Sequence, residues 1–251
     1  DAADDDPAIA IVQNENYKSV TTEARLDEVA EALDKAEVIS IDTETIGLGH
    51  RTDLAGICLS WQVESGVYIP VVCPDDRACL PLDVILDKLK PALTDPKKLK
   101  VAHNLKYDYL VMKHAGLEMT GPYFDTMVAA FLLNEPGLKL DDLVLAQLGH
   151  RMIPIERLIG PKPSGRNKTP QKSMAEIDLD IVTQYAAEDA DMTLRLYELF
   201  MPRLERGGMS TLAEDVEMPL AEVLAEMEDA GIRVDPDTLD QQRDELQQRI
   251  D

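Results

Sequence analysis

The first group of residues that could do chemistry is Asp42-Thr43-Glu44, at the end of the apolar run 38–41, which predicts a β-strand. Side chains alternate along a strand, so Ser40, Asp42 and Glu44 share one face if the extended backbone continues. Neighbouring carboxylates repel each other unless a proton or a cation intervenes, and hard divalent cations prefer oxygen ligands. The pattern therefore predicts a cation site. A solvated turn is the alternative, because Asp-x-Glu is common by chance.

A second candidate acid, Asp108, lies one turn beyond Asn104 in a helix predicted over residues 104–115. Asn104 is a suitable N-cap, and the positive end of the helix dipole stabilises a carboxylate in the first turns. The apolar stripe of this helix consists of Leu105, Tyr109 and Met112. Asp108 fits a functional acid and, equally, a favourable first-turn acid on a solvated face.

The third candidate, Asp189, interrupts the apolar stripe of a long helix predicted over residues 181–200. The inward-facing series is Ile181, Tyr185, Asp189, Met192, Leu196 and Leu199. Tyr185 stands four residues before Asp189, so the phenol and the carboxylate lie on the same helix face. A carboxylate on a buried stripe costs free energy unless it is paired or binds a metal. The alternative is a stripe that drifts and leaves Asp189 exposed beside Glu188 and Asp191.

Composition limits the function classes open to the chain. Its 251 residues carry 25 Lys and Arg against 48 Asp and Glu, a formal net charge of -23, and 45% of them are hydrophobic. Attraction of nucleic acid by global charge is therefore excluded, but a bound divalent ion can still neutralise phosphate locally. No apolar run approaches the roughly 20 residues of a membrane helix, and no secretory leader is recognisable. We therefore expect a soluble chain.

Neither the cysteines nor the common nucleotide-binding motifs point to a site in this chain. Cys58, Cys73 and Cys79 form an odd set without CxxC spacing, so we expect neither a disulfide framework nor cysteine-bound zinc. The chain contains no GxxxxGK[ST] loop, no GxGxxG after a strand and no HExxH pair. The acidic positions are therefore the main candidates for chemistry.

The elements that must position these acids indicate an α/β fold. Strands are predicted over 38–41, 54–61, 67–72 and 99–102, and helices over 22–36, 82–93, 104–115, 125–133, 140–148 and 181–200. This order predicts a mixed sheet, a meander of three strands followed by a crossover, with helices packed against it. Residues 1–20 are predicted to be an acidic tail or linker, and a mostly helical segment follows residue 208.

Taken together, these segments resemble a known family. Asp42-Thr43-Glu44-Thr45, Asn104-Leu105-Lys106-Tyr107-Asp108 and Tyr185-Ala186-Ala187-Glu188-Asp189 are similar to the three motifs of the DEDD exonucleases, and the tyrosine marks the DEDDy branch. The resemblance is strongest to the 3′-5′ proofreading exonuclease domain of bacterial family A DNA polymerases, the DNA polymerase I family. Residues 155–160, 124–127 and 216–220 resemble the same family, which places an exonuclease domain at 21–208 and the truncated start of a polymerase module at 209–251.

The resemblance implies an RNase H-like mixed sheet flanked by helices and followed by a short helical segment. It also implies that Asp42, Glu44, Asp108 and Asp189 bind two divalent ions, Mg²⁺ or Mn²⁺. Tyr185 would orient the water that attacks the terminal phosphodiester, because a phenol is too weak an acid to be a general base at neutral pH. The expected product is a nucleoside 5′-monophosphate, released from a single-stranded or frayed DNA 3′ end.

The residues expected to contact DNA are less distinctive. The resemblance suggests that Leu48 and Tyr107 wedge or stack the terminal bases, although core packing is an alternative for both. Asn104 either contacts DNA or only caps its helix. The basic loop residues Lys162, Arg166 and Lys168 can follow phosphates or simply keep the loop soluble.

Two other functions share parts of this pattern. An RNase D-like exoribonuclease has the same DEDDy motifs but would act on RNA 3′ ends, and the polymerase-like residues from Val216 onwards argue against it. A non-catalytic scaffold of a polymerase would not need the four carboxylates that this chain retains. We therefore expect a DNA exonuclease, monomeric, located in the bacterial cytoplasm and covalently linked to a polymerase module.

Overall fold

The computed structural model describes residues 13–47, 49, 51–73, 79–164 and 170–250. The strands of one sheet are β1 Tyr17–Ser19, β2 Val38–Thr45, β3 Leu54–Ser60, β4 Gly66–Pro70, β5 Leu99–Ala102 and β6 Tyr123–Asp125. The helices around the sheet are α1 Glu23–Lys35, α2 Leu82–Leu93, α3 Leu105–Ala115, α4 Thr126–Leu132, α5 Leu140–Leu148, α6 Ile155–Ile159 and α7 Leu179–Arg206. A C-terminal series follows, comprising α8 Ser210–Leu212, a π-helical turn Ala213–Glu217, α9 Met218–Ala230 and α10 Pro236–Ile250.

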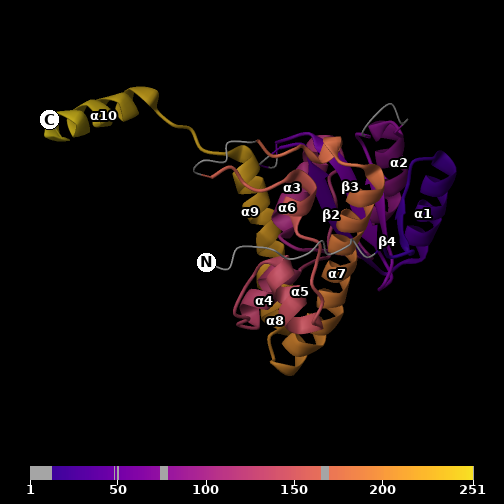
Figure 1. The fold of residues 1–251 in the computed structure, drawn as a ribbon. Helices are drawn as coiled ribbons and strands as arrows, with labels where there is room; N and C mark the ends of the chain where they lie inside the picture. The colour runs from indigo at the N-terminus through magenta and orange to yellow at the C-terminus, as the bar shows by residue number, and fades with distance from the viewer. Residues whose placement is uncertain (1–12, 48, 50, 74–78, 165–169, 251) are drawn as a thin grey trace, which may run out of the picture.

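The sheet has the strand order β1-β4-β3-β2-β5-β6. Figure 1 labels its strands β2, β3 and β4. Strands β2, β3 and β4 form the antiparallel meander expected from the sequence, while β5 and β6 run parallel to β2 after a crossover. Strands β3 and β4 are buried along their whole length, which is why their sequences read as continuous apolar runs. The predicted mixed α/β sheet is confirmed.

The two outermost strands, β1 and β6, escaped prediction. Each has three residues, too few for an alternating pattern to be visible in the sequence. Strand β1 falls within residues 1–20, where the sequence predicts a linker, yet it pairs in parallel with β4. The ordered sheet therefore starts before the end of the segment that we expected to be a tail.

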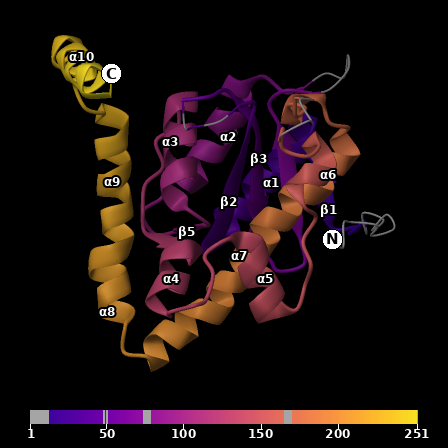
Figure 2. The same cartoon turned by 60° about the vertical axis from the view of Figure 1, so that its left-hand side comes forward.

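Helices cover both faces of the sheet. One face packs against α1, α2 and α3 through a cluster that includes Leu33, Ile39, Ile41, Leu89 and Tyr109. On the other face α7 crosses strands β1 to β5, as Figure 2 shows, with α4, α5 and α6 packed around it. Because β2 lies at the centre of the sheet, its end is reached from both layers.

The beginning of α7 differs from the predicted stripe. Ile181 is 39% exposed, because Val182 and Ala186 are the residues that face the sheet in these first turns. Further along, Met192 and Leu196 are buried as predicted, and Leu199 is half-buried. The stripe therefore rotates along the helix, but it keeps Asp189 inside.

The cysteines correct one expectation. A disulfide joins Cys73 to Cys79, whose Cα atoms are 5.7 Å apart, and Cys58 is a buried free thiol. The expectation of no disulfide framework did not anticipate this single pair, because two cysteines six residues apart can bond without CxxC spacing. Among the described residues, no helix combines the length and the apolarity that crossing a membrane requires.

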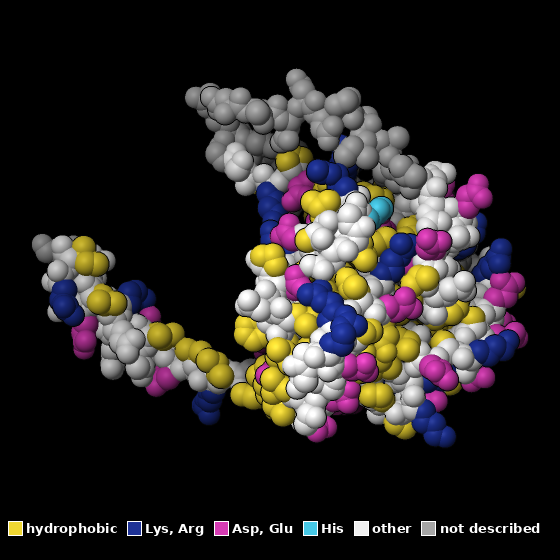
Figure 3. Space-filling view, turned by 90° about the horizontal axis from the view of Figure 1, so that it is seen from below, with side chains coloured by type: hydrophobic (Ala, Val, Ile, Leu, Met, Phe, Trp, Pro, Cys, Tyr) yellow, Lys and Arg dark blue, Asp and Glu magenta, His cyan; other side chains and the backbone are white. Residues whose placement is uncertain are grey.

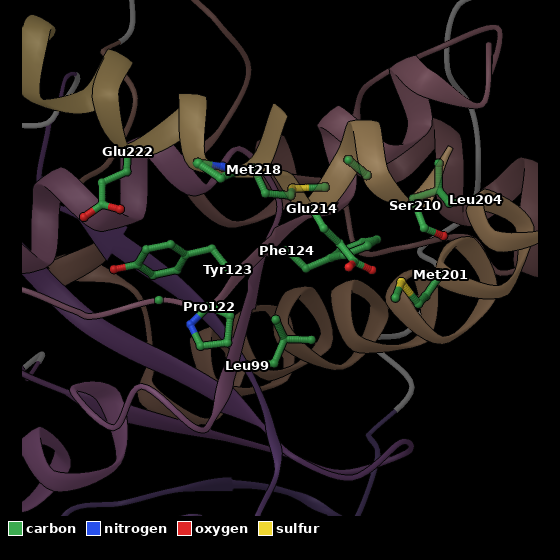
Figure 4. Close-up of a pocket in the computed structure, with 13 residues that line it drawn as sticks. Leu99, Pro122, Tyr123, Phe124, Met201, Leu204, Ser210, Glu214, Met218 and Glu222 are labelled. Carbon is green, nitrogen blue, oxygen red and sulfur yellow. The ribbon is translucent and has the colours of Figure 1, made fainter. Parts of the chain in front are cut away.

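The C-terminal helices differ in how they meet the body. Helix α9 lies alongside α3, as both Figures 1 and 2 show, whereas α10 extends away and has no buried residue. The first turn of α9 contacts β6 through Met218, and a cavity of about 360 Å³ lies beside this contact, between α9, the sheet edge and the end of α7 (Figure 4).

Close approach of strand and helix at Gly66 generates a stability prediction. A Cβ atom at Gly66 would lie 2.7 Å from the backbone oxygen of Ala187 in α7, so the strand or the helix must move. We expect Gly66→Ala to lower the free energy of unfolding by about 1–3 kcal/mol, the usual cost of overpacking, measured by urea denaturation.

Gly137→Ala is the matched control, because the added Cβ there meets its nearest atom at 3.6 Å, an ordinary contact. Its effect should stay within about 0.5 kcal/mol. Equal stabilities of the two variants would contradict the packing of β4 against α7.

Candidate active site

Four carboxylates from three elements converge where β2 ends. Asp42 and Glu44 come from β2, Asp108 from α3 and Asp189 from α7. Asp108 and Asp189 are only 2% and 8% exposed, so the solvated alternatives for both are excluded. The structure thus brings together all four acids that the sequence singled out.

Strand pairing sets the first two acids. Asp42 lies opposite Cys58 of β3, and Glu44 lies opposite Gly56, with an irregularity in the register directly after Glu44. Ligand atoms of Asp42, Glu44 and Cys58 lie within 4.8 Å of one another. The predicted shared face of Asp42 and Glu44 is therefore confirmed, and Cys58 is a neighbour that the sequence did not indicate.

Asp108 reaches the end of β2 from the opposite layer. The hydroxyl of Thr43, which points away from Asp42 and Glu44, donates a 2.7 Å hydrogen bond to Oδ1 of Asp108. Beside it, the hydroxyl groups of Thr45 and Tyr107 are 2.9 Å apart. Thr43 and Thr45 thus both hold side chains of α3. Because side chains alternate along a strand, the sequence could have suggested that these two residues face the layer opposite to Asp42 and Glu44.

The start of α3 is held by an acid whose role the sequence did not predict. Asn104 occupies the N-cap position with a left-handed backbone (φ 69°), but its side chain makes no capping hydrogen bond. Instead the buried carboxylate of Asp125 accepts hydrogen bonds from the backbone N–H groups of Asn104 (3.0 Å) and Leu105 (2.8 Å). It also caps α4 through Met127. The capping role predicted for the Asn104 side chain is wrong, and Asp125 performs it.

On α7, the neighbours of Asp189 hold the helix in its orientation. Asp191 is fully buried and accepts hydrogen bonds from the Tyr17 hydroxyl (2.7 Å) and the Glu64 backbone N–H (2.8 Å), and it pairs with Arg195. Glu188 likewise binds the segment before α6, through His150 and the backbone of Ile153, at 2.7 and 2.8 Å. Since both flanking acids are bonded to other elements, the rotation of α7 and the direction of Asp189 are fixed.

Burial and mutual repulsion make the four carboxylates weak acids. Burial raises the pKa of Asp42 to about 7. Burial and the charge of Asp42 raise the pKa of Glu44, Asp108 and Asp189 well above their ordinary values, and Glu44 adds to the effect on Asp189. Burial and the charge of Asp189 also raise the pKa of the Tyr185 phenol. Tyr185 therefore stays neutral and hydrogen-bonds with Asp189.

This donor set fits a divalent cation. Oxygen ligands dominate it, they come from rigid elements, and the electrostatic neighbours that raise their pKa values are themselves acids. A cation bound among them would relieve both the desolvation and the repulsion.

A groove of about 450 Å³ runs from Glu44 towards α6. Its walls include Glu44, Thr45, Tyr107, Ile155, Ile159 and Met174. Tyr107 is half-buried and faces the groove, as the predicted contact with substrate requires, whereas Lys162 is exposed on the loop beyond α6. Leu48, Arg166 and Lys168, also predicted to contact DNA, lie outside the described residues.

The face shown in Figure 3 has no basic patch that would offset the net negative charge of the chain. There, Lys and Arg side chains are interspersed with Asp and Glu rather than gathered into a continuous basic surface. On this face, a polyanionic ligand would not be attracted by a broad positive potential.

Comparisons with known proteins agree with this site. Residues 17–205 match the family model described as 3′-5′ exonuclease. The chain is 35% identical to DNA polymerase I of Borreliella burgdorferi over 229 residues, covering 90% of this chain and 24% of that protein. It is 41% identical to DNA polymerase I of Rhizobium leguminosarum over 233 residues, covering 84% of this chain and 22% of that protein. The chain thus spans about a quarter of the length of the curated relatives that it matches.

Among solved structures, Escherichia coli RNase D has a similar fold, with a TM-score of 0.63 and 22% identity, over 84% of this chain and 51% of that chain. The expected RNase H-like fold is therefore confirmed.

The raised pKa values predict how pH changes stability without metal. A carboxyl group whose pKa is higher in the folded than in the unfolded state favours folding most below its unfolded pKa, near 4. This contribution is lost as the pH rises through the folded pKa, which is about 7 for Asp42. In EDTA, the free energy of unfolding should fall between about pH 5 and about pH 8. Mg²⁺ should restore more of it at the higher pH, because it binds the ionised site.

Asp42→Asn is the control, since the amide removes this titration and should flatten the profile measured by urea denaturation. Identical pH profiles for the wild type and Asp42→Asn in EDTA would contradict the burial of an ionisable site.

Proposed function

The chain belongs to the 3′-5′ exonuclease family represented in bacterial DNA polymerase I, and on that premise we propose that it hydrolyses the terminal phosphodiester bond at DNA 3′ ends. The products would be nucleoside 5′-monophosphates and a DNA strand shorter by one nucleotide. Within a polymerase this activity serves proofreading, because it removes a mispaired and therefore frayed terminus.

The observation that supports the proposal is the convergence of four acids where β2 ends, namely Asp42, Glu44, Asp108 and Asp189, with Tyr185 hydrogen-bonded to the last of them. Glu44 also lines the adjoining groove. A scaffold domain gains nothing from four buried acids that repel one another, since such a group destabilises the fold unless it is used. Hydrolysis of a phosphodiester can use such a group, because the divalent ions that the acids would hold stabilise the negative charge that builds up on the phosphate during the reaction.

We assign the roles as follows. Asp42, Glu44 and Asp189 would hold one divalent ion. Asp42 and Asp108 would support a second, Asp108 through a water molecule. When bound, Mg²⁺ or Mn²⁺ supplies activation of water and stabilisation of the leaving 3′ oxygen. Thr43 keeps the Asp108 carboxylate in place, and Asp125 anchors the helix that carries it.

Tyr185 acts as a neutral phenol. Its raised pKa excludes it as a base at neutral pH, so it orients the attacking water by hydrogen bonding, next to the carboxylate of Asp189. The water oxygen forms the new bond to phosphorus while the bond to the 3′ oxygen of the penultimate nucleotide breaks.

The groove would receive the last nucleotides of the strand. Tyr107 and the apolar side chains Ile155 and Ile159 offer surfaces against which bases can stack or pack without regard to sequence. Lys162, with Arg166, Lys168 and Leu48, completes the set of residues that we propose to contact DNA.

We further propose that residues 21–208 form the exonuclease domain and residues 209–251 the start of a polymerase module, and that the chain acts as a monomer in the bacterial cytoplasm. The alignments support the link to a polymerase, because the curated relatives continue well beyond the matched part. The second candidate function, an RNase D-like exoribonuclease, is favoured only by the shared fold.

Removing one metal-binding carboxylate should abolish most of the activity. For Asp42→Ala we expect kcat/KM on single-stranded DNA to fall on the order of a thousandfold or more, since several kcal/mol of charge stabilisation are lost. For Tyr185→Phe we expect a loss of about ten- to a hundredfold, the range for one hydrogen bond of about 1–3 kcal/mol. Release of nucleotides from a 5′-labelled oligonucleotide measures both.

Asp87→Ala, at an exposed position on α2, should behave as the wild type in the same assay. Near-native activity of Asp42→Ala would overturn the assignment of the site.

A comparison of DNA with RNA separates the two candidate functions. With Mg²⁺ or Mn²⁺, a 5′-labelled DNA oligonucleotide should shorten stepwise from its 3′ end, faster than an RNA of the same sequence, and EDTA should stop the reaction. A faster reaction on RNA would favour the exoribonuclease instead.

A further inference from the structure

Helix α3 stands between the candidate active site and α9, and its two sides serve different partners. Tyr107 and Asp108 face β2 and the groove. Lys106, Tyr109 and Lys113, at helical spacing on another side, contact α9. The residues immediately before and after the pair Tyr107-Asp108 are thus both held by α9.

The contacts on α9 come from acidic residues. Glu226 accepts hydrogen bonds from the Tyr109 hydroxyl (3.0 Å) and from the Lys113 ammonium group (2.6 and 2.7 Å). Glu228 forms an ion pair with Lys106. Lys113 lowers the pKa of Glu226, in keeping with a persistent pair.

Asp229 connects a further element. Its carboxylate is 2.7 Å from Nε2 of His114 and 3.2 Å from the ammonium group of Lys113. Its backbone oxygen accepts a 2.5 Å hydrogen bond from Arg51, in the connection between β2 and β3 that follows Asp42 and Glu44. Helix α9 is therefore tied to α3 and to the connection that follows β2.

The apolar side of α9 is made by few side chains. Its buried residues are Met218, Ala221 and Ala225, and the two alanines belong to the same core cluster as the apolar side chains of α3. Next to its first turn lies the 360 Å³ cavity of Figure 4, lined by Tyr123, Phe124 and Met218 among others. Small alanines leave the rotation of the helix loosely defined, so the acidic residues at its other end add the directional contacts to α3.

We propose that α9 is a positioning element of the exonuclease site: Glu226, Glu228 and Asp229 set the orientation of α3 and thereby place Tyr107 and Asp108. The family model matches only residues 17–205, so this helix lies outside the part by which the family is recognised. The proposal rests on the proposed function, and it makes the three acids positioning residues rather than catalytic ones.

The sign of the effect distinguishes positioning from simple electrostatics. If these acids only repelled DNA, neutralising them would strengthen substrate binding and lower KM, because the chain is already strongly negative. If they position α3, the same change must lower kcat/KM and raise the Mg²⁺ concentration needed for half-maximal activity, since Asp108 is displaced.

The first experiment compares two triple variants of the 251-residue chain. The test variant carries Glu226→Gln, Glu228→Gln and Asp229→Asn; the control carries Glu31→Gln, Glu245→Gln and Asp87→Asn, at exposed positions on α1, α10 and α2. Both lose the same charge. We expect kcat/KM of the test variant to be about fivefold or more below that of the control, about 1 kcal/mol in transition-state free energy.

A charge exchange provides the rescue. Glu228→Lys and Lys106→Glu should each lower kcat/KM, and the double variant should recover to within about twofold of the wild type if the pair acts through its mutual attraction. Absence of recovery in a double variant with wild-type thermal stability would overturn the proposal.

Hydrogen exchange of the α3 backbone gives a readout that does not depend on activity. The test variant should exchange faster in α3 than the control, with or without a functional nuclease, so failure of the proposed function remains distinguishable. Unchanged exchange in α3 would overturn the proposal. Faster exchange with kcat/KM equal to the control would also overturn it, because α9 would then stabilise α3 without positioning the site.

Discussion

Repulsion among four buried carboxylates is the constraint around which this structure is organised. Water would screen these charges, but the acids sit where the sheet and two helices exclude most of it, so their pKa values rise. Such a group does not assemble by attraction between its members. Each acid must be held by the element that carries it, and the fold supplies that support from three directions.

The supports are themselves polar and buried. Thr43 bonds Asp108, Asp125 anchors the start of α3, and Asp191 fixes α7 to β1 and to the turn before β4. Because each of these groups is buried with its partners, removing one partner would leave a polar atom unsatisfied, which costs more than the bond contributes. The candidate site is therefore rigid before any ion or substrate arrives, which favours catalysis by preorganised groups.

The sequence predicts the acids themselves well and their supports poorly, for a physical reason. Asp189 and Glu44 break local patterns, an apolar stripe and a strand end, and such breaks can be seen within a few residues. The contact between Thr43 and Asp108, the opposition of Asp42 and Cys58, and the capping by Asp125 depend on pairing between distant segments. Strands β1 and β6 were missed because a strand of three residues is too short to show an alternating pattern. Ile181 was wrongly predicted to face inward because the buried stripe of α7 rotates along the helix.

The late position of α7 in the chain has a consequence for biosynthesis. Domains form from the N-terminus as the ribosome extends the chain, and a long-range site closes only when its last segment arrives. A nascent chain that ends before α7 already carries Asp42, Glu44 and Asp108 but lacks Asp189 and the helix that covers strands β1 to β5. Incomplete chains released by stalled translation would thus lack one of the four acids and the helix that orients it, so the candidate site forms only in chains that extend through α7.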